Sequence, residues 1–140
     1  MNEVELEERR RRLQAVPLFS QCSEDTLDRV LELATEFEAA PGHVLVQPNE
    51  AGTGLFLLES GSAVVELPRK RVELGPGEFF GELALLNETS LHGARVSAAT
   101  PVRALAIRRE DFVSLLESEP RIAVAMLRVV AARLSGLLRD

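Results

Sequence analysis

Histidine, cysteine and the larger aromatic residues are scarce in this chain of 140 residues, which holds two His, one Cys and neither Trp nor Tyr. A metal site needs more imidazole and thiol ligands than the chain supplies. His43 and His92 lie outside any His-Glu-x-x-His pattern, and no Gly-x-Ser-x-Gly sequence occurs. We therefore expect no catalytic residue and no metal site, and we expect that the chain is not an enzyme.

Long apolar runs and an excess of basic charge are also lacking. No run approaches the length of a membrane span, and the N-terminal residues are charged where a secretory signal would be apolar. The net charge is −6, and the chain shows neither the basic face nor the aromatic stacking platforms of nucleic-acid modules. These absences predict a cytoplasmic protein that has no direct contact with nucleic acid or a membrane.

The basic run Arg9–Arg12 favours the opposite interpretation, a patch for a membrane or a nucleic acid. However, Glu5, Glu7 and Glu8 stand four residues before three of these arginines. Acid-first pairs at i,i+4 stabilise a solvated helix. We therefore interpret this run as part of a solvated helix within residues 2–15.

The remaining composition, with 46% hydrophobic and 27% charged residues, predicts one soluble domain over residues 1–140. Its N-terminal part, residues 1–35, is expected to be helical. Ser23 is placed to cap a helix whose first turn carries two acids. The apolar stripe of that helix follows the i, i+3, i+4, i+7 pattern at Leu27, Val30, Leu31 and Ala34.

From residue 36 the apolar pattern changes to that of strands. Short β-prone runs alternate with turns that contain Gly and Pro. The predicted strands lie at Phe37, Val44–Val46, Leu55–Leu58, Ala63–Leu67, Val72–Leu74, Ala94–Ala98 and Val102–Ile107. Short strands at this spacing indicate a small β-sandwich or roll over residues 36–108.

Two C-terminal helices are expected over residues 109–140, the first ending before Glu119-Pro120 and the last running from about Arg121 to Leu138. The apolar positions of the last helix form a heptad seam at Ala123, Leu127, Val130, Leu134 and Leu137. Two heptads are fewer than a coiled coil requires. The seam leaves two interpretations open: the helix closes over the roll, or it moves on ligand binding or forms a dimer.

A glycine-rich stretch, Gly75–Leu86, lies between two predicted strands and holds three glycines ahead of a short apolar run that begins with Glu82. Glycine allows positive φ and a close approach of the backbone to a ligand. A helical turn starting near Gly81 would direct unpaired backbone N–H groups outward, which makes an anion site. A cyclic phosphate would fit there, with Glu82 accepting a hydrogen bond from a ribose hydroxyl.

Phe80–Leu86, with the sequence Phe-Gly-Glu-Leu-Ala-Leu-Leu, resembles the phosphate-binding cassette of the cyclic-nucleotide-binding domain family of kinase regulatory subunits and catabolite-activator-type regulators. Val96–Thr100 resembles the closing strand of that cassette, and the whole resemblance covers about residues 13–135. It implies an α+β, mainly β fold: an eight-stranded antiparallel, jelly-roll-like β-roll with N-terminal and C-terminal helices and a cassette at residues 79–96. It also implies cAMP or cGMP as ligand, with no other cofactor. The implied ligand-binding residues are Phe80, Gly81, Glu82, Leu83, Ala84, His92, Arg95 and Val96.

The second half of the cassette departs from the family pattern. In the family, an arginine four residues before the closing valine pairs with the phosphate, and a Ser or Thr directly before the valine donates a hydrogen bond. Here His92 and Arg95 occupy these two positions. An Arg–phosphate contact is worth roughly 1.5 to 3 kcal/mol, so its loss would weaken binding about ten- to a hundred-fold. Either Arg95 or protonated His92 replaces it, or the pocket is degenerate and Arg95 only neutralises Glu82.

Two functions follow from these alternatives. The first is a cyclic-nucleotide sensor or regulatory module that transmits ligand occupancy through its C-terminal helix to a protein partner or in a homodimer. The second is a domain that has lost the ligand and serves as a dimerisation or interaction scaffold. In the second case the surface of the last helix is the functional part.

Overall fold

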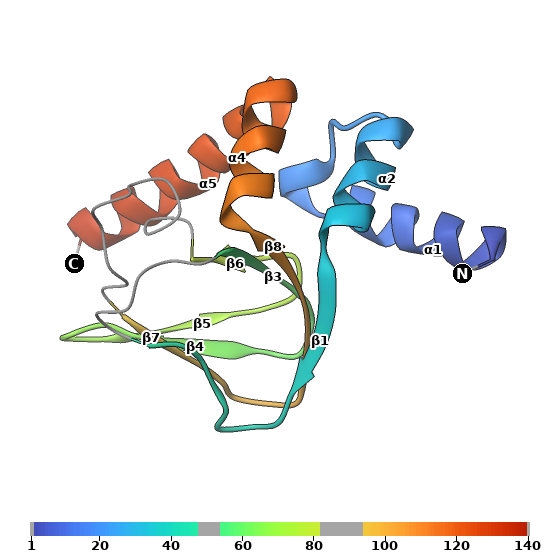
Figure 1. The fold of residues 1–140 in the computed structure, drawn as a ribbon. Coiled ribbons are helices and arrows are strands. Elements are labelled where there is room, and N and C mark those ends of the chain that lie inside the picture. Colours follow the sequence, from blue (N-terminus) through green and yellow to red (C-terminus); the bar gives the residue numbers. More distant parts are fainter. Residues whose placement is uncertain (1, 48–53, 82–93, 140) are drawn as a thin grey trace. The chain divides into compact units, whose positions relative to one another are not determined.

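The computed structural model describes residues 2–47, 54–81 and 94–139 (Figure 1). The helical elements are α1 (Glu3–Gln14), the 3-10 turn η1 (Pro17–Phe19), α2 (Glu24–Leu33), α4 (Arg109–Ser118) and α5 (Pro120–Arg139). The strands are β1 (Thr35–Ala39), β2 (Val44–Val46), β3 (Gly54–Ser60), β4 (Ala63–Glu66), β5 (Arg71–Leu74), β6 (Phe79–Phe80), β7 (Arg95–Ala98) and β8 (Val102–Arg108). All seven predicted strands are present. The additional strand β6 is two residues long, too short for any periodicity to show.

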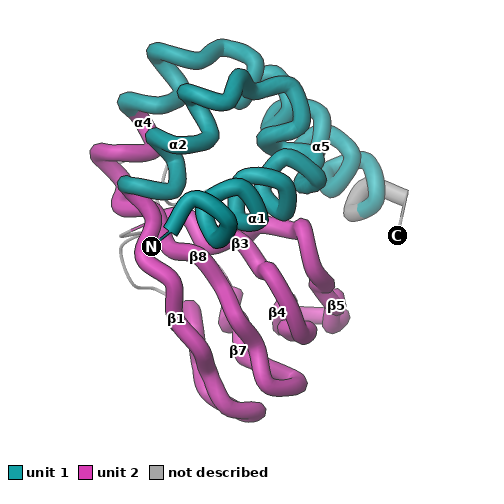
Figure 2. The backbone as a smooth tube through the Cα atoms, turned by 90° about the vertical axis from the view of Figure 1, so that its right-hand side faces the viewer, with its two compact units in different colours: residues 1–32, 114–140 teal, residues 33–113 magenta. Residues whose placement is uncertain are grey.

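The chain divides into two compact units, which Figure 2 shows in different colours. Unit 1 consists of residues 1–32 and 114–140, so it joins the two ends of the chain. Unit 2 consists of residues 33–113 and holds all the strands that the structure describes. We describe the two units separately.

The first helices of unit 1 begin at side-chain caps. The Asn2 Oδ1 atom accepts a hydrogen bond of 2.9 Å from the Glu5 backbone N–H, and the Ser23 Oγ atom accepts one of 3.2 Å from the Thr26 N–H. Each bond satisfies a donor that has no partner within the helix. The predicted cap at Ser23 is therefore confirmed. Of the predicted stripe on this helix, Ala34 lies beyond the end of α2 and is only half-buried.

The basic run of α1 is tied to α2 through Arg10. Its guanidinium binds both carboxylate oxygens of Asp28, one of them at 2.9 Å, and its Nη1 atom lies 2.9 Å from a carboxylate oxygen of Glu24. The hydrogen bonds from Arg10 lower the pKa of Asp28 below its ordinary value, although partial desolvation opposes this shift. One member of the run therefore stabilises the packing of α1 on α2.

Unit 1 is held together by apolar residues from both ends of the chain. The buried side chains are Leu13, Leu18, Phe19, Cys22, Leu27, Val30, Leu31, Leu115, Ile122 and Met126. Helix α5 packs on η1, where Pro17 starts a short turn that places Leu18 and Phe19 in this core. Cys22 is only 5% exposed, and burial raises the pKa of its thiol to about 11.

The apolar surface of α5 differs from the predicted seam. Among residues 120–136 of this helix, Ile122 and Met126 are buried, whereas Leu127 and Leu134, both seam positions, are 68% and 55% exposed. Val124 is also exposed, at 47%, and the side chain of Leu137 lies outside the described residues. The heptad pattern selected one of two adjacent apolar stripes, and the pattern alone does not identify which stripe meets the core.

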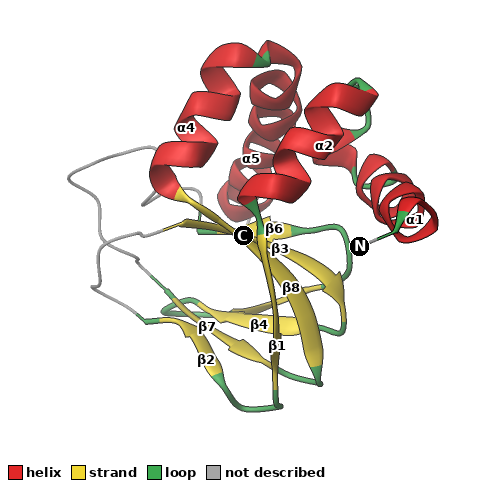
Figure 3. Ribbon diagram, turned by 45° about the vertical axis from the view of Figure 1, so that its right-hand side comes forward, coloured by secondary structure: helices red, strands yellow, loops and turns green. Residues whose placement is uncertain are grey.

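Unit 2 consists of two antiparallel four-stranded sheets, which lie face to face in Figure 3. The strand order is β1-β8-β3-β6 in the first sheet and β2-β7-β4-β5 in the second. The core between them draws on both sheets and contains Val46, Leu58, Ala63, Leu74, Phe80, Val96, Ala98, Val102 and Ala104. The prediction of an eight-stranded antiparallel β-roll with helices before and after it is confirmed.

Two turns of the roll are hydrogen-bonded to each other beside Gly61. The Ser62 backbone N–H donates a 2.9 Å hydrogen bond to the Thr100 hydroxyl, and the Ala99 N–H donates one of 2.9 Å to the Ser62 carbonyl. Gly61 has φ +84, a conformation that glycine adopts without strain. These bonds join the β3–β4 turn to the β7–β8 turn and set the pairing between β4 and β7.

Candidate functional site

The entry to the cassette is a turn that its own glutamate closes. The Glu78 carboxylate accepts a 2.6 Å hydrogen bond from the Gly75 N–H, and the Glu78 backbone N–H donates to the Gly75 carbonyl. The turn is also bonded to β3, since the Gly77 N–H donates to the Leu58 carbonyl and the Leu58 N–H donates to the Glu78 carbonyl. Glu78 therefore has a structural role, and the turn aims β6 into the core.

Phe80 is buried in an aromatic group of the first sheet. Its ring stacks on that of Phe56, with centroids 5.1 Å apart and an interplanar angle of 17°. Phe37 meets Phe56 edge to face at 5.9 Å. Both arrangements are favourable for aromatic rings. The structure thus places this predicted site residue in the core, where it anchors the first end of the cassette.

Gly81 follows with φ +95, as expected for a glycine at this bend. A Cβ atom on Gly81 would lie 2.7 Å from the backbone oxygen of Gly54. The close approach that glycine allows here is therefore to the first residue of β3. The helical turn predicted after Gly81, together with Glu82, Leu83, Ala84 and His92, lies outside the described residues.

The other end of the cassette is anchored by Val96 on β7. Val96 is buried in the same core cluster as Phe80, although the two residues belong to different sheets. The structure therefore brings together two residues that the sequence separates by the length of the cassette. Both of its ends are fixed by packing against one apolar core.

Arg95 lies beside Val96, but its side chain is on the opposite face of β7 because successive residues of a strand alternate between faces. It is 49% exposed, and its Nη1 atom lies 3.8 Å from the Oε2 atom of Glu66. Glu66 is its direct partner across the β4–β7 ladder. The structure thus shows Glu66 beside Arg95. The pairing of Arg95 with Glu82 that the sequence suggested stays a prediction, since Glu82 lies outside the described residues.

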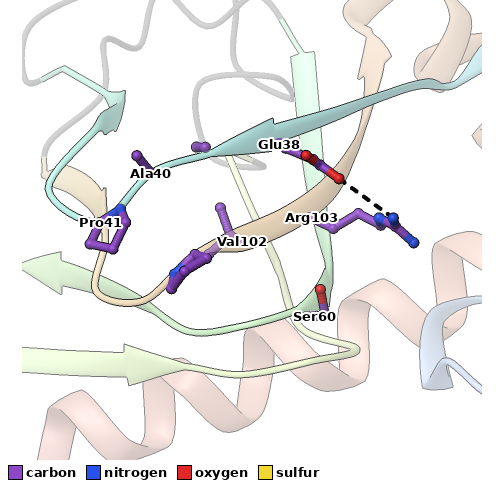
Figure 4. Close-up of a pocket in the computed structure, with 8 residues that line it drawn as sticks. Glu38, Ala40, Pro41, Ser60, Val102 and Arg103 are labelled. Carbon is purple, nitrogen blue, oxygen red and sulfur yellow. Dashed lines mark hydrogen bonds and ion pairs between the residues drawn. The ribbon is translucent and has the colours of Figure 1, made fainter.

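The described part of unit 2 has a hollow away from the cassette, shown in Figure 4. It is lined by Glu38, Ala39, Ala40, Pro41, Ser60, Pro101, Val102 and Arg103. None of the predicted site residues belongs to it. The Arg103 guanidinium at its edge is 3.1 Å from Glu36 and 3.4 Å from Glu38, so the charges there are paired.

Two other kinds of feature are absent from the part of the chain that the structure describes. No group of three or more His, Cys, Asp or Glu side chains there is placed to hold a metal ion. No described helix combines the length and the apolar character needed to cross a membrane.

Known proteins share both the sequence pattern and the fold. The profile of the cyclic nucleotide-binding domain matches residues 36–119. A cyclic nucleotide-gated potassium channel of Rhizobium etli is 34% identical over 122 residues, which are 87% of this chain and 34% of the channel. The catabolite activator protein of Thermus thermophilus superposes with a TM-score of 0.74 and 28% identity over 86% of this chain and 59% of that protein.

The regulatory domain of Toxoplasma gondii PKA, crystallised with cAMP, has the same fold at a TM-score of 0.79 and 21% identity, over 90% of this chain and 50% of that one. The chain spans 29% to 34% of the length of the first curated relatives that it matches. The two antiparallel sheets with N-terminal and C-terminal helices define the class of helix-flanked β-roll domains. Within that class, the chain belongs to the cyclic nucleotide-binding domain family.

Proposed function

We propose that this domain binds cAMP or cGMP and that ligand occupancy regulates a partner through helix α5. One observation carries the proposal: the residues at the two ends of the cassette, Phe80 and Val96, are packed into a single core. Buried side chains at both ends of a loop restrict where its backbone can lie, which would favour binding of a ligand there. The names of the relatives, which include a channel gated by cyclic nucleotides, support the choice of ligand.

In the proposed site the cyclic phosphate binds the backbone N–H groups that follow Gly81, including those of Leu83 and Ala84. The ribose 2′-hydroxyl donates a hydrogen bond to Glu82, and the buried side chains of Phe80 and Val96 anchor the two ends of the loop. A cation is also required, because an anion in a partly closed site needs a charged partner. Arg95 and His92 are the two candidates.

The proposal extends to the organisation and location of the chain. We treat residues 1–140 as one regulatory domain, in which residues 1–35 and 109–140 supply the helices and residues 36–108 the roll. It would act in the cytoplasm, and its partner would be another protein or a second copy of the chain. It uses no other cofactor and does not contact nucleic acid or a membrane.

Isothermal titration of the purified domain with cAMP and with cGMP at pH 7 tests the proposal. The nucleotide content of the protein as purified must be measured beforehand, because a ligand that co-purifies would conceal binding. Micromolar or tighter binding of either nucleotide supports the regulatory function. Absence of heat with both nucleotides, in protein shown to be free of nucleotide, would overturn it.

The second candidate function, an interaction scaffold without ligand, is favoured by the exposed apolar side chains of α5. Val124, Leu127 and Leu134 are spaced at i, i+3 and i+10, which places them on one side of the helix. Exposed apolar stripes of this kind are typical of protein contacts. This candidate and the sensor differ in what they require: the scaffold needs the stripe and no nucleotide.

Sedimentation of the wild-type domain beside Leu127→Glu tests whether the stripe is a dimer contact, whereas the nucleotide titration distinguishes the scaffold from the sensor. A self-associating domain should lose its dimer in Leu127→Glu, because the new carboxylate would be buried at the contact. Ala132→Glu is the matched control, since Ala132 is exposed on another side of the same helix. A dimer that persists in Leu127→Glu excludes the stripe as its interface.

A further inference from the structure

Two arginines share one carboxylate on the outward face of the second sheet. Glu66 of β4 lies between Arg71 of β5 and Arg95 of β7, and it is the direct cross-strand partner of both. Its Oε1 atom is 3.4 Å from Arg71, and its Oε2 atom is 3.8 Å from Arg95. The two cations therefore bind different oxygens of the same side chain.

We propose that Glu66 regulates nucleotide affinity by competing with the cyclic phosphate for Arg95. This inference rests on the proposed function and assigns a role to a residue outside the cassette. Arg95 is the first residue of β7, the point at which the chain returns from the cassette to the sheet. Among the described residues, the carboxylate beside its guanidinium is that of Glu66, and in the proposed exchange the phosphate replaces it.

The geometry makes this exchange easy. The pair is half exposed, at 49% for Arg95 and 39% for Glu66, and its 3.8 Å separation is at the outer limit of an ion pair. Exposed pairs of this kind contribute little, whereas a guanidinium binds a phosphate through shorter, charge-assisted hydrogen bonds. The phosphate should therefore displace Glu66 from Arg95. Glu66 should lower the affinity of the domain for the nucleotide without preventing binding.

Arg71 determines what happens to Glu66 after the exchange. Because Arg71 binds the Oε1 atom, the carboxylate keeps one cation when Arg95 leaves its Oε2 atom. An unpaired acid beside an incoming anion would oppose binding. Arg71 thus acts as a positioning residue. Without it, of these two arginines only Arg95 would pair with Glu66, and the competition with the phosphate would be stronger.

Titration of cAMP and cGMP into Glu66→Gln tests the competition. We expect a dissociation constant about two- to five-fold lower than in the wild type, the range that a weak exposed pair allows. Glu73→Gln is the matched control: Glu73 is exposed on the outward face of β5, but it pairs with Val64 across the ladder. It removes the same charge from the same face without touching Arg95.

Arg71→Gln should weaken nucleotide binding by a similar factor, because Glu66 would then have Arg95 as its remaining arginine partner of the two. Arg69→Gln, in the adjoining turn, is the control for this variant.

A double-mutant cycle separates competition from a structural effect. In an Arg95→Gln background, Glu66→Gln should no longer change affinity, whereas a general effect on the fold would persist. If the wild type binds nucleotide and the dissociation constants of Glu66→Gln and Glu73→Gln are equal, the inference is overturned and the proposed function is left intact. Failure of the wild type and of Glu66→Gln alike to bind either nucleotide would overturn both. Binding by Glu66→Gln alone would support both.

Discussion

Gly61 lies so close to Pro101 that a Cβ atom on Gly61 would stand 2.2 Å from the backbone oxygen of Pro101. The same atom would be 3.0 Å from the Thr100 hydroxyl oxygen, which accepts the Ser62 N–H hydrogen bond. The two turns that meet here set the pairing of β4 with β7, and thereby the pairing of Glu66 with Arg95. A glycine far from the cassette in sequence therefore helps to position its last strand.

Gly61→Ala should accordingly destabilise the domain far more than Gly42→Ala. Both glycines have positive φ, but a Cβ on Gly42 would meet nothing within 4 Å. Gly42→Ala should cost roughly 1 to 2 kcal/mol, the penalty of a left-handed backbone for alanine. In Gly61→Ala the new Cβ atom also overlaps the backbone of Pro101, which is held by the hydrogen bonds between the two turns. The loss in free energy of unfolding should therefore be larger by at least about 1 kcal/mol than in Gly42→Ala. Urea unfolding followed by circular dichroism measures the free energy of unfolding of both variants. Equal losses of stability would contradict the close contact between the two turns at Gly61.

Arg95→Ala should weaken nucleotide binding by roughly ten- to a hundred-fold, the value of one Arg–phosphate contact. Calorimetric titration at pH 7 with the preferred nucleotide gives the ratio directly. Arg103→Ala is a suitable control, since this half-exposed arginine pairs with Glu36 and Glu38 on the other sheet. Unchanged affinity in Arg95→Ala would exclude Arg95 as the phosphate partner.

The alternative cation, His92, predicts a pH dependence. A histidine side chain is ordinarily protonated only below about pH 6.5, and only the protonated ring carries a charge. If His92 binds the phosphate, affinity should rise as the pH falls from about 8 to 6, and His92→Gln should abolish that rise. Contact through Arg95 alone gives a flat profile. A flat titration of the wild type would therefore remove His92 from the site.

The contact between Arg10 and Asp28 predicts how unit 1 responds to acid. Because the hydrogen bonds from Arg10 lower the pKa of folded Asp28, the stabilisation is fully present above the ordinary aspartate pKa of about 4. It is lost as the pH falls from there through the lower folded value. Thermal unfolding between pH 6 and pH 2 should show a smaller loss of stability in Asp28→Asn than in the wild type. Asp25→Asn in the same helix serves as control, and an identical acid response in Asp28→Asn would refute the prediction.

Cys22 should be nearly unreactive in the folded protein. Burial raises the pKa of its thiol to about 11, so at pH 8 roughly one thiol in a thousand is ionised. An ordinary cysteine, with a pKa of about 8.5, is ionised to roughly a quarter at that pH. The reaction with Ellman's reagent should therefore be at least about a hundred-fold slower in the native protein than in concentrated guanidinium chloride. Comparable rates in the two conditions would show that the helices around Cys22 open readily.

The local sequence determined the elements of this protein and the family of its roll. Seven strands, the cap at Ser23 and the bends at glycine follow from patterns that act over a few residues, such as side-chain alternation and backbone freedom. The strand β6 was not foreseen, because two residues carry no period. The resemblance at Phe80–Leu86 identified the family, since it depends only on residues that are adjacent in the chain.

Only the tertiary structure decided which residues from distant elements meet. Glu66 and Arg95 face each other because β4 pairs with β7 in one register, and a shift by one residue would move Arg95 to the core face. The choice between two apolar stripes of α5, in which Ile122 is buried and Leu127 exposed, was likewise set by packing on η1. The partner of a side chain depends on the summed packing of the whole core, and no local pattern encodes that sum.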